Sequence, residues 1–275
     1  MAKLSLDLSD ELIVFTGGAG TLGSAMAQRL LACGARVILL SRNQEKLEQV
    51  AADFRNAIAG AQVETLATNV TDQAALENAL QQIQQNWGTP TTLINAAGGN
   101  QAGATVMPAA DLFATEPAAW RKVIDLNLMG TILPSIVFGG AMAALDRPTQ
   151  IINISSMAAA RPLTRVGGYA ASKAAVDSFT AWLAIELAQR YEGRIRVNAI
   201  APGFFIAEQN RALLTNPDGS YTQRGQQVID QTPMKRFGEP EELQGVLLWL
   251  LSEDAAFVTG TVIAVDGGFG CFAGV

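Results

Sequence analysis

The sequence predicts one α/β domain built on a doubly wound, seven-stranded parallel sheet with helices on both faces. Short runs of β-branched and other apolar residues alternate with amphipathic stretches along the chain, which is typical of βαβ units. Most of these runs are apolar throughout, as expected for strands that helices cover on both faces. The 275 residues, of which 49% are hydrophobic, suffice for one substantial core, so we expect a single domain over 1–275.

The strands are expected where apolar residues cluster between turn residues. In chain order they are Leu12–Phe15, Arg36–Leu40, Val63–Ala67, Thr92–Asn95, Gln150–Ile154, Ile195–Ile200 and Val262–Val265. Helices are expected between them, with starts near Ser24, Leu126 and Tyr169. Two long irregular segments, 98–116 and 203–238, follow the fourth and sixth strands. Loops at the carboxyl ends of parallel strands build the sites of such sheets, so we expect the substrate loops there.

One stretch, Leu126–Leu145, is uncharged over twenty residues and has about the length of a membrane span. It contains Asn127, Pro134 and three glycines in mid-domain, so we predict a buried helix instead. The first residues, Met1–Leu12, carry three acids before the first apolar run, which is wrong for a secretory signal. We therefore expect a cytoplasmic protein without a membrane partner.

Charge and composition point to a small-molecule partner. The net charge is −6, the sequence pI is near 4.8 and no basic run occurs, which argues against nucleic acid. Histidine is absent, and Cys33 and Cys271 lie far apart in the sequence, so neither a histidine-based metal site nor a disulfide framework is expected. Without imidazole, tyrosine is the natural proton carrier.

Tyr169, Lys173 and Ser156 supply a phenol, a lysine and a hydroxyl for proton transfer to a carbonyl. Residues four apart lie on one face of a helix, so Tyr169 and Lys173 would point into the same cleft. A phenol has an ordinary pKa of about 10, and a nearby ammonium favours its phenolate. Ser156 could hydrogen-bond the carbonyl oxygen. Alone, this Tyr-x-x-x-Lys spacing also arises by chance in helices.

A glycine-rich turn follows the first predicted strand and opens the first helix. Backbone amides at a helix N-terminus can meet a pyrophosphate, and the helix dipole favours its negative charge. The predicted contacts are Gly17, Gly18, Gly20, Thr21, Leu22 and Gly23. An ordinary glycine turn is the alternative.

Together these motifs resemble those of the short-chain dehydrogenase/reductase family, in the family's order and from about Leu8 to the C-terminus. The remaining motifs are Asn95-Ala96-Ala97-Gly98, Asn127, Pro202-Gly203 and Asp266-Gly267-Gly268. The resemblance implies a Rossmann fold, a nicotinamide cofactor and a homotetramer. It also implies that Tyr169 donates the proton, Lys173 lowers its pKa and holds the nicotinamide ribose, Ser156 orients the carbonyl, and Asn127 fixes a water. Asn127 could instead simply cap or interrupt a helix.

The resemblance further implies which residues border the cofactor. They are Asn69 and Val70 after the third strand, Asn95, Ala96, Ala97 and Gly98 after the fourth, and Pro202 and Gly203 after the sixth. Thr21 replaces the family's usual second glycine, and Asn69 stands where an aspartate is more usual.

The end of the second strand discriminates between the two nicotinamide cofactors. An acid there would bind the ribose 2′-hydroxyl of NAD, whereas a cation would accept the extra phosphate of NADP. The chain has Ser41 and Arg42 and no carboxylate at this point. A guanidinium can pair with a phosphate in a bidentate way, so NADP(H) is favoured, with NAD(H) as the alternative.

The two long loops carry a polar inventory that suits a sugar acid. A polyol needs many hydrogen-bond donors and acceptors, and a sugar acid also needs a cation for its carboxylate. The predicted substrate residues are Asn100, Gln101, Gln209 and Asn210, with Arg211, Arg161 and Arg165 as the candidate cations. The alternative for any one of these arginines is a solvated surface residue.

The loops and the C-terminal segment 266–275 resemble those of the D-mannonate oxidoreductase (fructuronate reductase) branch of the family. The resemblance implies reversible reduction of D-fructuronate to D-mannonate. A gluconate 5-dehydrogenase or another polyol dehydrogenase is the alternative enzyme. A dinucleotide-binding sensor or scaffold without catalysis is the alternative of another class, although such proteins usually lack part of the Tyr-Lys-Ser set.

Overall fold

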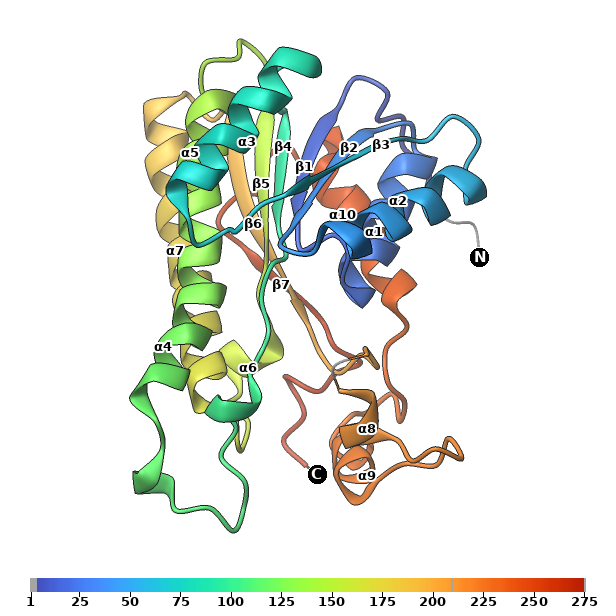
Figure 1. Cartoon of the computed structure of the whole chain (residues 1–275), viewed down its shortest axis with the longest axis vertical. Coiled ribbons are helices and arrows are strands. Elements are labelled where there is room, and N and C mark those ends of the chain that lie inside the picture. The colour runs from blue at the N-terminus through green and yellow to red at the C-terminus, as the bar shows by residue number, and fades with distance from the viewer. Residues whose placement is uncertain (1–3, 209, 275) are drawn as a thin grey trace.

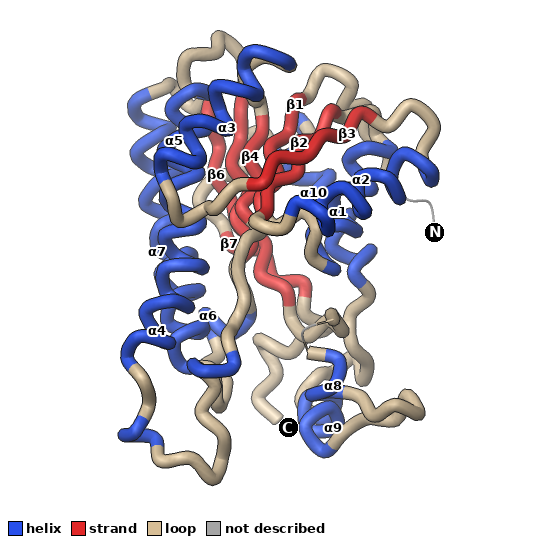
Figure 2. Tube along the Cα trace, viewed as in Figure 1, coloured by secondary structure: helices blue, strands red, loops and turns tan. Residues whose placement is uncertain are grey.

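The computed structural model describes residues 4–208 and 210–274, and it confirms the predicted sheet (Figures 1 and 2). Within these residues, seven parallel strands form one sheet in the order β3-β2-β1-β4-β5-β6-β7. The strands are β1 (Leu12–Thr16), β2 (Arg36–Ser41), β3 (Gln62–Ala67), β4 (Thr92–Asn95), β5 (Thr149–Ile154), β6 (Ile195–Pro202) and β7 (Val262–Val265). Each lies within two residues of its predicted bounds.

The helices connect the strands and cover both faces of the sheet (Figure 1). They are α1 (Thr21–Ala32), α2 (Gln44–Ala57), α3 (Gln73–Asn86), α4 (Pro117–Ile124), α5 (Gly130–Met142), α6 (Met157–Ala160), α7 (Gly167–Arg190), α8 (Arg211–Leu214), α9 (Gln223–Asp230) and α10 (Leu243–Leu251). Local sequence explains several starts: the side chains of Asn43 and Asp72 accept hydrogen bonds from the first turns of α2 and α3.

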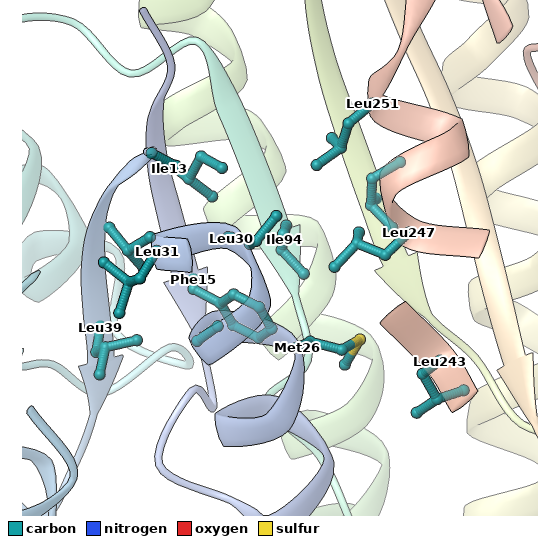
Figure 3. Packing of buried hydrophobic residues seen from close by; sticks show 14 of the residues in the cluster. Ile13, Phe15, Met26, Leu30, Leu31, Leu39, Ile94, Leu243, Leu247 and Leu251 are labelled. Atoms are coloured by element: carbon teal, nitrogen blue, oxygen red, sulfur yellow. The ribbon is translucent and has the colours of Figure 1, made fainter. Parts of the chain in front are cut away.

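The core has two halves, one on each face of the sheet. Successive strand residues point to opposite faces, so Ile13 and Phe15 pack against α1, α2 and α10 (Figure 3), whereas Leu12 and Val14 face α3, α5 and α7. All five residues of β1 are buried. Burial on both faces explains why the central strands have almost entirely apolar sequences.

Two predicted helix starts were wrong. The first helix begins at Thr21 rather than near Ser24, because Gly20 has the extended backbone of an N-cap residue. The helix expected from Leu126 already begins as α4 at Pro117, and a π-helical turn over Asp125–Met129 joins α4 to α5. Proline at the first helical position favours that earlier start.

By length and composition, the helical segment Pro117–Met142 could cross a membrane, and 44% of its most apolar window is buried inside the protein. Val137, Phe138 and Met142 of α5 belong to the core half that packs on β1, β4 and β5. Its apolar character therefore has a structural explanation as a core helix.

The order in which successive strands are added to the sheet reverses between β1 and β4. At this point such folds form a crevice at the carboxyl ends of the strands. The segments after β1, β4, β5 and β6 all emerge at this edge. The two segments expected to be irregular contain short helical pieces: single 3-10 turns at Ala102–Ala104 and Leu112–Ala114, and α8 and α9 after β6. A small apolar cluster of Leu214, Val228, Ile229 and Phe237 packs α8 and α9 together.

Candidate active site

The glycine turn after β1 leaves no room for a side chain at Gly17 or Gly23. Gly17 has φ +71°, and a Cβ there would lie 2.7 Å from the backbone of Ala96 and Ala97. A Cβ on Gly23 would lie 2.5 Å from the carbonyl oxygen of Gly17. No side chain caps the first turn of α1, and that turn holds no acid. The positive end of α1 is therefore open to an anion.

A cavity of about 410 Å³ lies at the switch point, in front of this turn. Its walls include eleven of the predicted cofactor residues: Gly17, Gly20, Thr21, Leu22, Gly23, Ser41, Ala96, Ala97, Gly98, Pro202 and Gly203. Its far end is lined by Ser156, Tyr169 and Lys173. A cradle that a Cβ would fill, a helix N-terminus and an elongated cavity together fit a dinucleotide.

Five predicted cofactor residues do not line the cavity: Gly18, Arg42, Asn69, Val70 and Asn95. Gly18 faces inward, where a Cβ would lie 2.6 Å from the Leu39 side chain. The Asn95 amide donates to Ser135 Oγ (3.0 Å) and Asn153 Oδ1 (2.9 Å) and so joins β4 to α5 and β5. Gly18, packed against Leu39, and the Asn95 side chain therefore lie behind the cavity walls.

Helix α7 presents Tyr169 and Lys173 to the cavity as the spacing predicted. The helix begins at Gly167. Gly167 and Gly168 lie against the Trp120 ring, and a Cβ on Gly167 would lie 2.9 Å from it. Lys173 Nζ lies 5.8 Å from the centroid of the Tyr169 ring and donates to the carbonyl oxygen of Ile154 at 2.6 Å. The ammonium is thus buried between β5 and the phenol.

The electrostatics of the phenol differ in part from the sequence-based expectation. Burial raises the pKa of Tyr169, and the Ser156 hydroxyl opposes this rise. Burial lowers the pKa of Lys173 to about 8, and the charge of Asp177 partly opposes that fall. Desolvation therefore acts on the pKa of Tyr169 more strongly than any neighbouring charge.

Ser156 caps α6 without using its own hydroxyl proton. Its Oγ accepts a hydrogen bond from the amide of Ala158 at 3.1 Å. A serine hydroxyl that accepts from the backbone can still donate its own proton. The neighbouring Ser155 points elsewhere and donates to Asp177 Oδ1, so the two serines have different surroundings.

Asp177 is a half-buried partner of this group that the sequence reasoning missed. It lies one helical turn after Lys173 on α7, and its position four residues after Lys173 was the signal that could have revealed it. Burial raises its pKa, whereas the Ser155 hydroxyl and the Lys173 charge lower it. Lys173, Asp177 and Ser155 thus form one charge-balanced cluster behind the phenol.

Asn127 lies in the π-helical turn between α4 and α5, where its side chain is fully used by the chain itself. Its amide donates to the carbonyl oxygens of Gly99 and Val123, both at 2.8 Å, and its Oδ1 accepts from the amide of Gly99 at 3.0 Å. These bonds match the alternative in which Asn127 interrupts a helix. They fix the backbone at Gly98 and Gly99, which forms one cavity wall.

Two cations follow β2, and one of them lines the cavity. Arg42 is exposed and makes no side-chain bond to the described residues, whereas Lys46, at the start of α2, lines the cavity. Lys46 Nζ contacts Glu208 Oε2 at 3.0 Å, which connects α2 with the loop after β6. The sequence reasoning missed Lys46, although it lies only four residues after Arg42.

Several predicted substrate residues serve the loops themselves. The Asn210 amide donates to the carbonyl oxygen of Phe205, and its Oδ1 accepts from the amide of Ala207. Asn100 donates to Thr105 Oγ1 at 2.7 Å, and its buried Oδ1 has no partner among the described residues. Gln101 is half-buried beside it, and Gln209 lies outside the described residues.

The three predicted cations have different environments. Arg161 donates through Nε and Nη2 to the carbonyl oxygens of Gly270 and Phe272, so it holds the C-terminal segment. Arg211 is exposed at the start of α8. Arg165 is half-buried before α7, with φ +75°.

Comparison with known proteins is consistent with this geometry. Residues 17–270 match the family described as enoyl-(acyl carrier protein) reductase. A solved structure from Haemophilus influenza, named "putative D-mannonate oxidoreductase" with bound NAD, has a TM-score of 0.90 and 38% identity, with 98% of each chain covered. The chain belongs to the short-chain dehydrogenase/reductase family. This short-chain dehydrogenase/reductase is therefore an oxidoreductase that acts on a CH–OH group with a nicotinamide dinucleotide, and a non-catalytic role is set aside.

Two curated relatives cover nearly the whole enzyme. The "Uncharacterized oxidoreductase UxuB" of Bacillus subtilis (strain 168) is 42% identical over 100% of both chains. The galactitol 2-dehydrogenase of Rhizobium johnstonii is 34% identical, with 96% of this chain and 97% of the relative covered.

Proposed function

We propose that the enzyme interconverts a sugar keto acid and its alcohol, with D-fructuronate and D-mannonate as the pair. The observation that carries this proposal is the likeness over 98% of the chain to the structure named for D-mannonate oxidoreductase. The polar loops after β4 and β6, 98–116 and 203–238, support it as the substrate loops of a single domain over 1–275. A polyol dehydrogenase, such as a gluconate 5-dehydrogenase, is the second candidate, favoured by the likeness to galactitol 2-dehydrogenase.

In the proposed mechanism, Tyr169 is the proton donor in reduction. Bound nicotinamide supplies a hydride in reduction and accepts one in oxidation. The carbonyl carbon gains that hydride while its oxygen gains the phenolic proton, so a ketone becomes a secondary alcohol and Tyr169 recovers its proton from solvent. Ser156, whose proton is not used by the α6 cap, holds the carbonyl oxygen toward the phenol.

Lys173 supports this step by its charge. Its ammonium, 5.8 Å from the Tyr169 ring centroid, favours the phenolate that reduction leaves behind. The Ile154 carbonyl oxygen and Asp177 keep the ammonium in place. Asn127 takes a positioning role, because its bonds to Gly99 hold the wall beside Lys173, where a Cβ on Gly98 would lie 3.3 Å from Nζ.

NADP(H) is the proposed cofactor, with NAD(H) as the alternative. Arg42 follows β2 without an acidic partner among the described residues, and Lys46, which lines the cavity and pairs with Glu208, is a second cation after the same strand. A 2′-phosphate would pair with these cations. The NAD in the Haemophilus influenza structure favours the alternative.

We also propose that the enzyme is cytoplasmic and that it forms a homotetramer. The apolar side chains of Ile136, Trp182 and Ile185, which α5 and α7 expose, support the proposed assembly.

The deciding experiment follows nicotinamide absorbance with NADPH or NADH and D-fructuronate. 5-Keto-D-gluconate and a hydrophobic ketone serve as the comparison substrates. Oxidation of the reduced cofactor by D-fructuronate, and not by the two comparison substrates, supports the proposal. Turnover with 5-keto-D-gluconate alone supports the second candidate. A higher kcat/KM with NADPH, lost in Arg42→Ala, would support the cofactor assignment, whereas an unchanged preference in that variant would contradict the role of Arg42.

A further inference from the structure

The C-terminal segment 266–272 follows β7 (Figure 1) and is held in place by two charged side chains. Arg161, the C-cap residue of α6, donates through Nε to the carbonyl oxygen of Gly270 at 2.9 Å and through Nη2 to that of Phe272 at 2.8 Å. Asp266 Oδ2 accepts from the amide of Gly270 at 2.6 Å. Hydrogen bonds to charged groups are stronger than those between neutral groups. The position of the segment therefore depends on this cation and this anion.

The same segment lies against the helix that Ser156 caps. Met157, the first residue of α6, follows Ser156 directly and is buried. A Cβ on Gly270 would lie 2.0 Å from Met157 Cε, so the backbone of the segment contacts this side chain. The amide of Arg161 donates to the carbonyl oxygen of Met157 at 2.9 Å, which closes the single turn of α6. Because close-packed groups transmit displacements, a shift of the segment would reach the residue next to Ser156.

The segment also contacts a second wall of the cavity, which the chain after β6 forms. The Phe269 ring packs edge-to-face on the Phe204 ring, with the centroids 5.1 Å apart. Phe204 lines the same cavity as Ser156 and Tyr169. One segment thus connects α6 with the chain after β6 at the reactive end of the site.

Phe204 has open space beside it, so its position depends on its few neighbours. It is half-buried and packs on the apolar cluster of α8 and α9. Besides the site cavity it lines a second cavity of about 400 Å³, whose walls include Asp266, Gly267 and Gly268. Side chains in close-packed interiors are fixed by their neighbours, whereas a ring beside a cavity has room for other rotamers. The Phe269 ring therefore limits the rotamers of Phe204.

We propose that Arg161 is a positioning residue, which holds the C-terminal segment so that the segment fixes both walls of the reactive end. Through Met157 the segment keeps Ser156 aimed at the carbonyl oxygen. Through Phe269 it fixes the side of the substrate and nicotinamide space that Phe204 forms. Small displacements of reacting groups slow a reaction strongly. This inference rests on the proposed role of Ser156 and holds for any keto acid bound there.

The test compares Arg161→Gln and Arg161→Lys with the wild type, on the keto acid that the wild type reduces. We expect kcat/KM in Arg161→Gln to fall roughly tenfold or more, the equivalent of one hydrogen bond to a charged group, and mainly through kcat. The dissociation constant of the dinucleotide should be unchanged, because the glycine turn proposed to bind it is untouched. With cofactor deuterated at the transferred position, the isotope effect on kcat should increase, since misplacement slows hydride transfer itself. Arg161→Lys should recover part of the rate, because lysine keeps the charge without the paired donors of the guanidinium.

Phe269→Ala tests the path to Phe204. The double variant with Arg161→Gln should be no slower than the slower single variant, because both substitutions act through one segment. Arg194→Gln is the matched control. Arg194 donates to the carbonyl oxygen of Leu145 at 2.7 Å and directly precedes β6, at the end of the strand away from the cavity. Its substitution should leave kcat/KM unchanged.

Wild-type kcat/KM in Arg161→Gln would overturn the proposal, as would losses that multiply in the double variant. A loss of dinucleotide affinity that matches the loss of kcat/KM would indicate general damage to the fold and would also overturn it. If the wild type reduces no keto acid, the proposed function fails separately, and hydrogen exchange with the dinucleotide bound, followed by mass spectrometry, then decides. Faster exchange in both 156–161 and 203–206 of Arg161→Gln supports the proposal, and unchanged exchange in either overturns it.

Discussion

At the residue scale, Tyr169 is the group on which the proposed chemistry depends. Tyr169→Phe removes only the hydroxyl, so we expect turnover to fall by roughly 100- to 10,000-fold, the usual contribution of a general acid. Dinucleotide affinity should stay near the wild-type value, because the cradle at Gly17 and Gly23 is untouched. Steady-state rates and fluorescence titration with the reduced cofactor measure the two quantities, and an active Phe variant would refute the assignment.

A second residue-scale prediction concerns Asp177. Its negative charge raises the pKa of Lys173 against the effect of burial, which lowers that pKa to about 8. Reduction needs the cationic lysine, so activity should decline as the pH rises through about 8. In Asp177→Asn the raising influence is gone, Lys173 loses its proton at lower pH, and the alkaline limb of the kcat/KM profile should move to lower pH.

Well below this limb, Asp177→Asn should retain near wild-type kcat/KM, because Lys173 is then cationic in both proteins. A profile of Asp177→Asn that is scaled down at all pH values without a shift would indicate a structural role only.

At the element scale, the turn between β1 and α1 depends on glycines that cannot carry a side chain. In Gly23→Ala the new Cβ would meet the Gly17 carbonyl oxygen at 2.5 Å, so the turn must shift away from the cavity. We expect the dissociation constant of the dinucleotide to rise at least tenfold, about 1.4 kcal/mol. Calorimetric titration of the cofactor checks this expectation.

The matched control for that element is Gly245→Ala in α10. A Cβ there meets no heavy atom within 4 Å, and alanine favours a helix interior over glycine by roughly 0.5–1 kcal/mol. We expect unchanged cofactor affinity and a slightly higher melting temperature. Equal affinity in the wild type and Gly23→Ala would contradict the proposed cradle.

At the scale of the whole molecule, α7 lies beside α5 on the same side of the sheet (Figure 1). Helix α7 exposes apolar side chains there. Trp182 and Ile185, one helical turn apart, are 55% and 59% exposed. Such a surface would suit the contact with a second subunit that the proposed homotetramer requires. The double variant Trp182→Glu with Ile185→Glu should lower the oligomeric state, measured by size-exclusion chromatography with light scattering.

Leu213→Glu provides the comparison, because this exposed apolar residue lies on α8, away from the α7 surface. It should leave the oligomeric state unchanged. A wild-type monomer in solution, or a double variant of unchanged mass, would contradict the proposed homotetramer.

The sequence by itself determined the features that depend on short-range regularity. Buried strands are local apolar runs, so their bounds were predicted to within two residues. Tyr169 and Lys173 lie on one face because a helix repeats every 3.6 residues. The glycine turn was equally readable, since backbone geometry there depends on neighbours in the chain.

Only the tertiary structure decided how side chains pair across the fold. Arg161 contacts a carbonyl 109 residues away, and Ser155 reaches Asp177 on another element. Such partners follow from how whole elements pack, and no local pattern encodes them. For the same reason the sequence did not reveal the bonds between Asn127 and Gly99: the partners of a side chain are known only after its neighbours are in place.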